Sequence, residues 1–152
     1  MNIEIYKGSA EKLRALFISR KAEMQIDKFG IELDDVKYMT EAQSFIDDND
    51  TDMIVIFDDS IPVGYMGLEY FVSPLSSQVI ANEQNWYVIP SYRGIWSIRL
   101  LQTAEAIAKN RGCSHLTMNA AMMASEMHDK LCTRYGKLGM DKYETSFIKS
   151  LD

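Results

Sequence analysis

The sequence has little of what metal sites and disulfide scaffolds require. Its 152 residues include only two cysteines, Cys113 and Cys132, and two histidines, His115 and His128. The cysteines form no Cys-x-x-Cys pair, and structural zinc sites need closely spaced Cys and His ligands. We therefore expect neither a metal site nor a disulfide framework.

Long apolar runs are also missing. The longest apolar stretches fall far short of the roughly 20 residues that a membrane-spanning helix needs. The first residues lack the basic stretch, followed by an apolar one, that marks a secretory signal peptide. These absences predict no membrane association and a cytoplasmic location.

The chain has fewer basic than acidic residues: 16 Lys and Arg against 22 Asp and Glu, which gives a formal charge of −6. No run of like charges exceeds a few residues, so nucleic acid is an unlikely partner. Hydrophobic residues make up 47% of the chain, which is enough to bury a core. The length is that of one domain, and we expect a single domain over residues 1–152.

Apolar spacing and turn residues divide the chain into ten predicted elements. Strands are expected over residues 3–5, 53–57, 61–71, 79–89, 115–119 and 143–148. Helices are expected over residues 10–28, in a short segment capped by Thr40 and Gln43, over residues 95–111, and from Ser125 to Gly139. This order predicts an α/β (α+β) fold with a mixed central sheet and helices on both faces.

The junction between the strand ending near Ile89 and the helix beginning at Ile95 has the features of an anion site. The free N–H groups and the positive dipole end of a helix N-terminus attract anions. Arg93 adds positive charge, and Gly94 lets a phosphate approach the backbone closely. The same residues also fit an ordinary tight turn, so both interpretations are open at this point.

Two motifs resemble a known family. The stretch W-Y-V-I-P-S-Y-R-G at residues 86–94, then L-L-Q-T-A-E-A-I-A-K-N-R-G-C-S-H-L at 100–116, resembles the acetyl-coenzyme A motif of the GNAT family of N-acetyltransferases. Y-G-K-L-G-M at residues 135–140 is similar to a later signature of that family, Y-x-K-x-G-F. The chain looks most like phage- and bacteria-encoded members with a W-Y-V-x-P-x-x-R-G segment. The N-terminal part fits in element order but contributes no motif.

The resemblance implies a mostly antiparallel sheet that is splayed between the strand ending at Val88 and the strand over 115–119. The polar run at residues 82–85 supports this, because it suits a strand beside a wet cleft. The implied activity is transfer of an acetyl group from acetyl-CoA to a primary amine of a small molecule or protein, by direct attack in a ternary complex. The implied cofactor-binding residues are Trp86, Tyr87, Val88, Arg93, Gly94, Ile95, Trp96, Ser97 and Ile98.

Acetyl transfer to an amine needs a base for the incoming ammonium and an acid for the leaving thiolate. Tyr135 matches the tyrosine that protonates the thiolate in many relatives, although its place on an apolar helix stripe also fits a core aromatic. Glu83 is the implied base, with Glu69 as a competitor and a solvent-facing strand carboxylate as the alternative interpretation. Asn119 is expected to orient the thioester or a bound water.

One departure from the family pattern leaves a second function open. After Gly94 the family usually has further small residues that let the loop wrap a pyrophosphate, whereas this chain has I-W-S-I-R at residues 95–99. The alternative is a catalytically weak relative that acts by binding coenzyme A or a protein partner. The retained Tyr135 and Arg93–Gly94 favour the enzyme.

The acceptor amine has no recognisable code in the sequence. We expect residues 24–38 and 71–81 to select it. Five methionines crowd the region after the strand expected at 115–119, and they fit either core packing or an adaptable acceptor wall or homodimer face. These methionines are Met118, Met122, Met123, Met127 and Met140.

Overall fold

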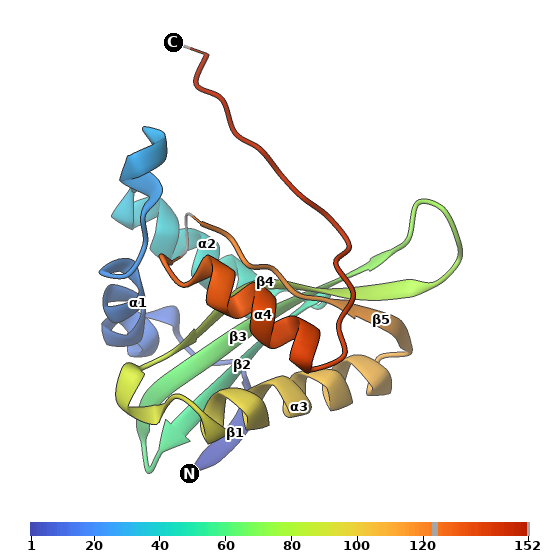
Figure 1. The fold of residues 1–152 in the computed structure, drawn as a ribbon. Coiled ribbons are helices and arrows are strands. Elements are labelled where there is room, and N and C mark those ends of the chain that lie inside the picture. The colour runs from blue at the N-terminus through green and yellow to red at the C-terminus, as the bar shows by residue number, and fades with distance from the viewer. Residues whose placement is uncertain (123–124, 152) are drawn as a thin grey trace.

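A five-stranded sheet runs through the protein in the order β1-β2-β3-β4-β5 (Figure 1). It is seen in a computed structural model that describes residues 1–122 and 125–151. The strands are β1 (Asn2–Tyr6), β2 (Thr51–Asp58), β3 (Ile61–Val72), β4 (Val79–Val88) and β5 (Cys113–Thr117). Neighbours from β1 to β4 are antiparallel, and β5 runs parallel to β4, so the mixed, mostly antiparallel sheet is confirmed.

Helices cover both faces of the sheet, as expected (Figure 1). On one face lie η1 (Ala10–Leu13), α1 (Arg14–Lys21) and α2 (Asp35–Asp47), whose buried side chains pack against β2 and β3. On the other face α3 (Ile95–Asn110) buries Leu100, Leu101 and Ala104 against Ile54 and Met66. Two further turns of 3-10 helix, η2 (Ile26–Phe29) and η3 (Pro90–Tyr92), and the helix α4 (His128–Lys137) complete the regular elements.

The first two predicted helices differ from the structure. The helix expected over residues 10–28 is divided into η1, α1 and η2, and Gly30 ends the last of these with a φ of +72°. The cap of α2 is Asp34, whose carboxylate accepts the Lys37 N–H at 2.9 Å, whereas Thr40 lies inside the helix and donates to the Val36 carbonyl. An acidic side chain at the helix start therefore sets the boundary, not the capping box.

The prediction of a strand over residues 143–148 is wrong. Residues 141–151 form neither helix nor strand, and all of them are exposed. Alternation of apolar and polar residues gives a strand propensity, but a strand forms only where a neighbour accepts its hydrogen bonds.

β4 opens away from β5 halfway along its length. Pairing between the two strands ends at Asn82 and Thr117, so residues 83–88 pair with β3 alone among the described residues. A bulge against β3 lies at the same place, because Leu68 faces Glu83 while Gly67 faces Asn85. A bulge re-aims the side chains that follow it. The expected splay is therefore confirmed, and it begins at Glu83.

Candidate functional site

The first turn of α3 presents free backbone donors. Gly94 is its N-cap and has a φ of +86°, a conformation that L side chains rarely adopt, so glycine is required there. A glycine cap offers no side-chain acceptor, and no side chain caps this end in the described part of the chain. The N–H groups at the start of a helix then point to a place where an anion binds favourably.

The predicted cofactor residues after Gly94 form that first turn. Ile95 is exposed, while Trp96, Ser97 and Ile98 are partly buried. The guanidinium of Arg99 lies over the Trp96 ring, 4.7 Å from its centroid. Arg99 is a cation near the helix start that the sequence reasoning missed, although its three-residue spacing from Trp96 was a usable signal.

Arg93 is engaged in an ion pair. Its Nη2 donates to both carboxylate oxygens of Glu23 at 2.7 Å, and its Nε donates to the Val88 carbonyl at 2.8 Å. Its guanidinium also lies 5.6 Å from the centroid of the Tyr87 ring. Arg93 thus joins the segment after α1 to the junction of β4 and α3, a contact that local sequence patterns do not reveal.

The end of β4 places its side chains on two faces. Trp86 and Val88 face the α3 side, and Trp86 stacks on Tyr135 with ring centroids 6.2 Å apart. Tyr87 belongs to the core on the α1 and α2 side and lies near Tyr65. On the side facing β5, the backbone of this stretch has no strand partner among the described residues.

Three of the predicted residues come together where β4 and β5 separate. Glu83 is only 4% exposed, and its carboxylate accepts the Asn119 N–H at 3.0 Å. The Asn119 side-chain amide donates to the Glu83 carbonyl, and the Asn119 carbonyl accepts the Tyr135 hydroxyl at 3.0 Å. Glu83, Asn119 and Tyr135 therefore form one cluster. The solvent-facing interpretation of Glu83 is wrong, because its carboxylate is buried and accepts the Asn119 N–H.

Burial changes the acidity of both titratable groups in this cluster. It raises the pKa of Glu83 to about 7, with the Asn119 hydrogen bonds and the positive charge of Arg20 opposing the rise. Burial and the charge of Glu83 also raise the pKa of Tyr135 well above its usual range. Near neutral pH, Glu83 is thus poised between its two protonation states, while Tyr135 keeps its proton.

A second, partly buried cluster lies on the α1 and α2 side. Arg20 donates to the Tyr38 hydroxyl at 3.1 Å, and the hydroxyls of Tyr38 and Tyr65 lie 3.4 Å apart. Sequence reasoning missed this cluster because its members come from α1, α2 and β3. Arg20 was assigned only to a helix, and nothing in the local pattern indicated that its charge lies inside the protein.

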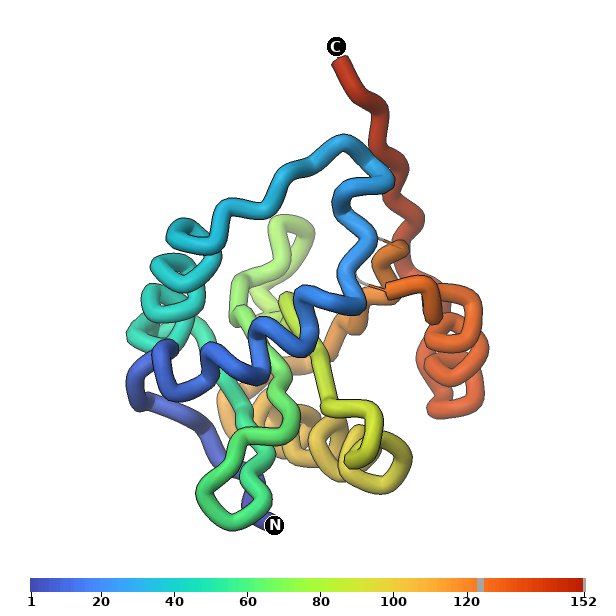
Figure 2. The backbone as a smooth tube through the Cα atoms, turned by 90° about the vertical axis from the view of Figure 1, so that its left-hand side faces the viewer, coloured from blue at the N-terminus to red at the C-terminus, as the bar shows by residue number. Residues whose placement is uncertain are grey.

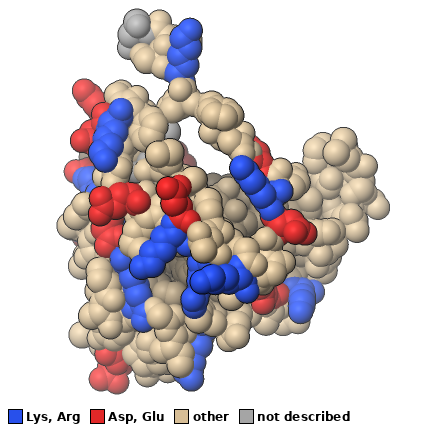
Figure 3. All heavy atoms as spheres, viewed as in Figure 1, with Lys and Arg blue, Asp and Glu red and all other residues tan. Residues whose placement is uncertain are grey.

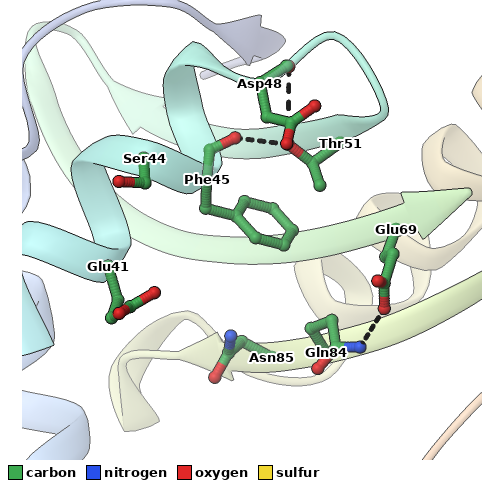
Figure 4. Close-up of a pocket in the computed structure, with 8 residues that line it drawn as sticks. All are labelled: Glu41, Ser44, Phe45, Asp48, Thr51, Glu69, Gln84 and Asn85. Carbon is green, nitrogen blue, oxygen red and sulfur yellow. Dashed lines mark hydrogen bonds between the residues drawn. The ribbon is translucent and has the colours of Figure 1, made fainter.

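An acidic hollow of about 360 Å³ opens between α2 and the β3–β4 hairpin (Figure 4). Gln84 donates to Glu69 across its floor, and Thr51 donates to the Phe45 carbonyl at its wall. Phe45 lies against the backbone of Gly67, where an added Cβ would be 3.0 Å from the ring. Glu69 thus lies in this hollow and apart from the Glu83 cluster. The lining residues are Glu41, Ser44, Phe45, Asp48, Thr51, Glu69, Gln84 and Asn85.

The surface carries charges of both signs. On the face shown in Figure 3, Lys and Arg side chains are interspersed with Asp and Glu. No helix in the described ranges has the length and apolar character needed to cross a membrane. Within residues 1–122 and 125–151, no group of His, Cys, Asp and Glu has the arrangement of a metal site.

A model of the Acetyltransferase (GNAT) family matches residues 19–132. The sequence has no significant match among curated proteins. Solved structures of similar fold include a ribosomal-protein-alanine N-acetyltransferase from Brucella melitensis, with a TM-score of 0.74, 18% identity and coverage of 99% of this chain and 100% of that one. An aminoglycoside 6'-N-acetyltransferase from Acinetobacter haemolyticus has a TM-score of 0.72 and 16% identity over 100% of both chains. A transcriptional regulator from Bacillus halodurans has a TM-score of 0.74 and 16% identity over 99% of this chain and 100% of that one.

Proposed function

Because the chain belongs to the GNAT acetyltransferase family, we propose that residues 1–152 form one domain that transfers an acetyl group from acetyl-CoA to a primary amine. The observation that carries this proposal is the buried cluster of Glu83, Asn119 and Tyr135 at the separation of β4 and β5. A carboxyl with a pKa near 7 beside a protonated phenol is the pair of groups that amine acetylation requires.

The residues at the start of α3 fit coenzyme A. The uncapped N–H groups after Gly94 suit a pyrophosphate. The backbone of residues 84–87 faces no strand on the β5 side within the described part of the chain, and this edge suits the amide groups of the pantetheine arm. Bound acetyl-CoA supplies an acetyl thioester, which is an activated acyl group. In this arrangement Trp86, Tyr87 and Val88 hold the arm, and Arg93 and residues 94–98 hold the phosphates.

Glu83 accepts a proton from the acceptor ammonium, directly or through water, so that a neutral amine attacks. Its buried carboxylate is a stronger base than an exposed one because burial disfavours its charge. Tyr135 keeps its proton at neutral pH and donates it to the leaving thiolate as the C–S bond breaks. The attacking nitrogen, now bonded to the acetyl carbon, loses a proton to the Tyr135 oxygen, directly or through water, which restores the phenol. Asn119 positions both groups, since its backbone contacts Glu83 through N–H and Tyr135 through C=O.

The acidic hollow supports a cationic amine as acceptor. Glu41, Asp48 and Glu69 line it on the far side of β4 from α3, and amines that carry positive charge gain from nearby carboxylates. Two of the similar structures are a ribosomal-protein-alanine N-acetyltransferase and an aminoglycoside acetyltransferase, enzymes that are named for amine-bearing substrates. The acceptor that we propose is a primary amine on a small molecule or a protein.

A catalytically weak protein that binds coenzyme A or a partner is the second candidate function. The ion pair of Arg93 with Glu23 supports this second function, because Arg93 is the residue predicted to bind the cofactor phosphates and its guanidinium is already paired.

We further propose a cytoplasmic location and a homodimer for the enzyme.

One experiment separates the two functions. Acetyl-CoA is titrated calorimetrically into the protein, and release of free coenzyme A thiol is then followed with a panel of cationic and neutral primary amines. Binding together with amine-dependent thiol release supports the enzyme. Binding without release from any amine supports a protein that acts by binding coenzyme A. No binding at millimolar acetyl-CoA rejects the enzyme and the coenzyme A-binding protein, and leaves partner binding as the second function.

A further inference from the structure

Three side chains at the start of α4 bring a thiol, an imidazole and a carboxylate into contact. The Cys132 sulfur lies 3.7 Å from Nε2 of His128, and Nδ1 of the same ring lies 2.9 Å from a carboxylate oxygen of Asp129. The Cys132 side chain is exposed, so a reactant can reach it. A nucleophile beside a base that a third group orients is the arrangement used in covalent catalysis.

The carboxylate determines which nitrogen of the imidazole carries a proton. An ionised carboxylate only accepts hydrogen bonds, so Nδ1 of His128 donates to Asp129. In a neutral imidazole the other nitrogen, Nε2, is then an acceptor, and it faces the Cys132 thiol. His128 is therefore placed to take the proton of that thiol, which produces the thiolate, the nucleophilic form of cysteine.

The thiol and the imidazole lie on the same stripe of α4 as Tyr135. His128, Cys132 and Tyr135 are spaced by four and then three residues, which places them on one side of the helix. Tyr135 is buried and stacks on Trp86, one of the residues proposed to hold the pantetheine arm. Figure 2 shows α4 on the opposite side of the molecule from α2. The Cys132 thiol thus lies one helical turn from the phenol proposed to protonate the coenzyme A thiolate.

We propose that Cys132 is a second nucleophile of this protein, which takes an acetyl group from an acetyl thioester and becomes S-acetyl-Cys132, with His128 as its base and Asp129 orienting the imidazole. The Cys132 sulfur attacks the acetyl carbon while His128 takes the thiol proton. The bond between the acetyl carbon and the donor's sulfur breaks, and His128 returns the proton to the leaving thiolate. One thioester replaces another, so nothing is oxidised or reduced.

The donor that this inference assigns is acetyl-CoA, and in that respect it rests on the proposed function. It adds self-acetylation of a thiol, which needs no acceptor amine and does not use Glu83. The acetyl group on Cys132 remains a thioester, so it stays reactive toward nucleophiles, unlike an acetyl group on a lysine.

Cys113 provides a matched control, because it is the only other cysteine of the chain. It begins β5 and is partly buried, and burial raises the pKa of its thiol, with the charge of Arg111 opposing the rise. A thiol with a raised pKa has a smaller thiolate fraction at neutral pH. Cys113 should therefore react more slowly than Cys132 with the same donor.

The test follows the mass of the intact protein during incubation with acetyl-CoA in the absence of an amine. The wild type is compared with Cys132→Ala, Cys113→Ala and His128→Gln. We expect one acetyl group on the wild type and on Cys113→Ala, which neutral hydroxylamine removes because it cleaves thioesters and leaves lysine amides intact. Cys132→Ala should gain no hydroxylamine-sensitive acetyl group, and His128→Gln should gain it at least about tenfold more slowly.

A second donor separates this proposal from the proposed function. The acetyl thioester of N-acetylcysteamine has the reacting end of the pantetheine arm without the phosphates, so it can react with Cys132 without binding at the start of α3. Calorimetry of the same four forms with acetyl-CoA measures cofactor binding independently, and Cys132→Ala should bind it like the wild type. Acetylation of Cys132 by the short thioester in a protein that does not bind acetyl-CoA would keep the nucleophile and reject the proposed function.

Three results would overturn the nucleophile while leaving the proposed function intact. One is a wild type that binds acetyl-CoA and gains no hydroxylamine-sensitive acetyl group from either donor. Another is acetylation of Cys113 at the same rate as Cys132, which would show an ordinary thiol reaction. The third is a His128→Gln variant that is acetylated as fast as the wild type, because the imidazole would then have no part in the reaction.

Discussion

The two ligand sites proposed on either side of β4 are built from different parts of the protein. On the α3 side, backbone groups and one obligatory glycine conformation form the predicted cofactor site. On the α2 side, the hollow is lined by side chains from α2 and three strands, and three of these are carboxylates. A site made of backbone groups depends on a short local motif, whereas a site made of side chains depends on residues that are distant in sequence.

This difference explains why the cofactor is easier to infer than the acceptor. Backbone donors bind a common cofactor regardless of most side chains nearby, so one motif serves many relatives. The acceptor side changes with each exposed side chain, and exposed substitutions cost little stability. We expect the two sides to be separable, so that a variant on one side leaves binding on the other side unchanged.

The largest effect is expected for Glu83→Gln. The variant keeps an oxygen for the Asn119 N–H but cannot accept a proton, so we expect kcat to fall by about a thousandfold. Wild-type kcat/KM should rise with pH through about 7, where Glu83 loses its proton. Steady-state kinetics over pH 5–9 with any acceptor amine measures both. A Glu83→Gln enzyme with wild-type kcat would remove Glu83 from the mechanism.

The stability of the same variant gives a control that needs no substrate. A carboxyl with a raised pKa binds its proton more tightly in the folded state, so wild-type stability falls as pH rises from about 4.5 to about 7. The loss amounts to roughly 3 kcal/mol at most. Glu83→Gln should lack this loss, which denaturant unfolding at pH 5 and pH 8 detects.

Tyr135→Phe should lower kcat by about a hundredfold and leave acetyl-CoA affinity nearly unchanged. The ring still stacks on Trp86, so the packing survives and only the proton donor is lost. Kinetics at saturating acceptor, with calorimetry for the cofactor, measure the two effects. An unchanged kcat, with chemistry shown to be rate-limiting, would leave Tyr135 as a core aromatic only.

Arg93→Ala should weaken acetyl-CoA binding by about 1.5–3 kcal/mol if the guanidinium reaches the phosphates. Glu23→Gln is the matched variant, because it breaks the same ion pair but leaves the cation in place. Calorimetric titration of both separates the roles. Equal losses of affinity in the two variants would mean that Arg93 acts by holding the segment after α1.

The smallest effect is expected for Glu41→Gln and Glu69→Gln, which should raise the KM of a cationic acceptor by several-fold each. Both residues border the hollow open to solvent, so salt weakens their attraction. Their acetyl-CoA affinity should equal that of the wild type. A loss of cofactor affinity as large as that of Arg93→Ala would contradict the separation of the two sides.

Patterns among neighbouring residues were sufficient to predict the elements around the candidate cofactor site. The strand over residues 79–89, the helix after Gly94 and the polar run before Trp86 each rest on neighbouring residues, and the structure places them as expected. The helix expected over residues 10–28 was too long, because apolar spacing continues through a region that the chain folds as 3-10 turns. Spacing does not distinguish the two helix types there.

For the candidate site, too, single residues could be proposed from the sequence, whereas contacts between distant segments could not. Glu83 and Tyr135 were proposed from the resemblance to the family, whereas their connection through the backbone of Asn119 is seen only in the folded chain. The partly buried Arg20–Tyr38–Tyr65 cluster and the Glu23–Arg93 ion pair had no sequence signal at all. Charged residues are ordinarily solvated, and only tertiary packing reveals which of them are enclosed.

The ion pair between Glu23 and Arg93 has an evolutionary consequence. It joins positions separated by 70 residues, and Arg93 also holds the Val88 carbonyl. Losing the carboxylate alone leaves a partly enclosed cation, and losing the cation alone leaves a partly enclosed anion, so each single change is unfavourable. Positions 23 and 93 should therefore covary among homologues, with acid and base lost together more often than separately. Such covariation would trace a constraint between the N-terminal third of the chain and the cofactor motif that neither segment displays by itself.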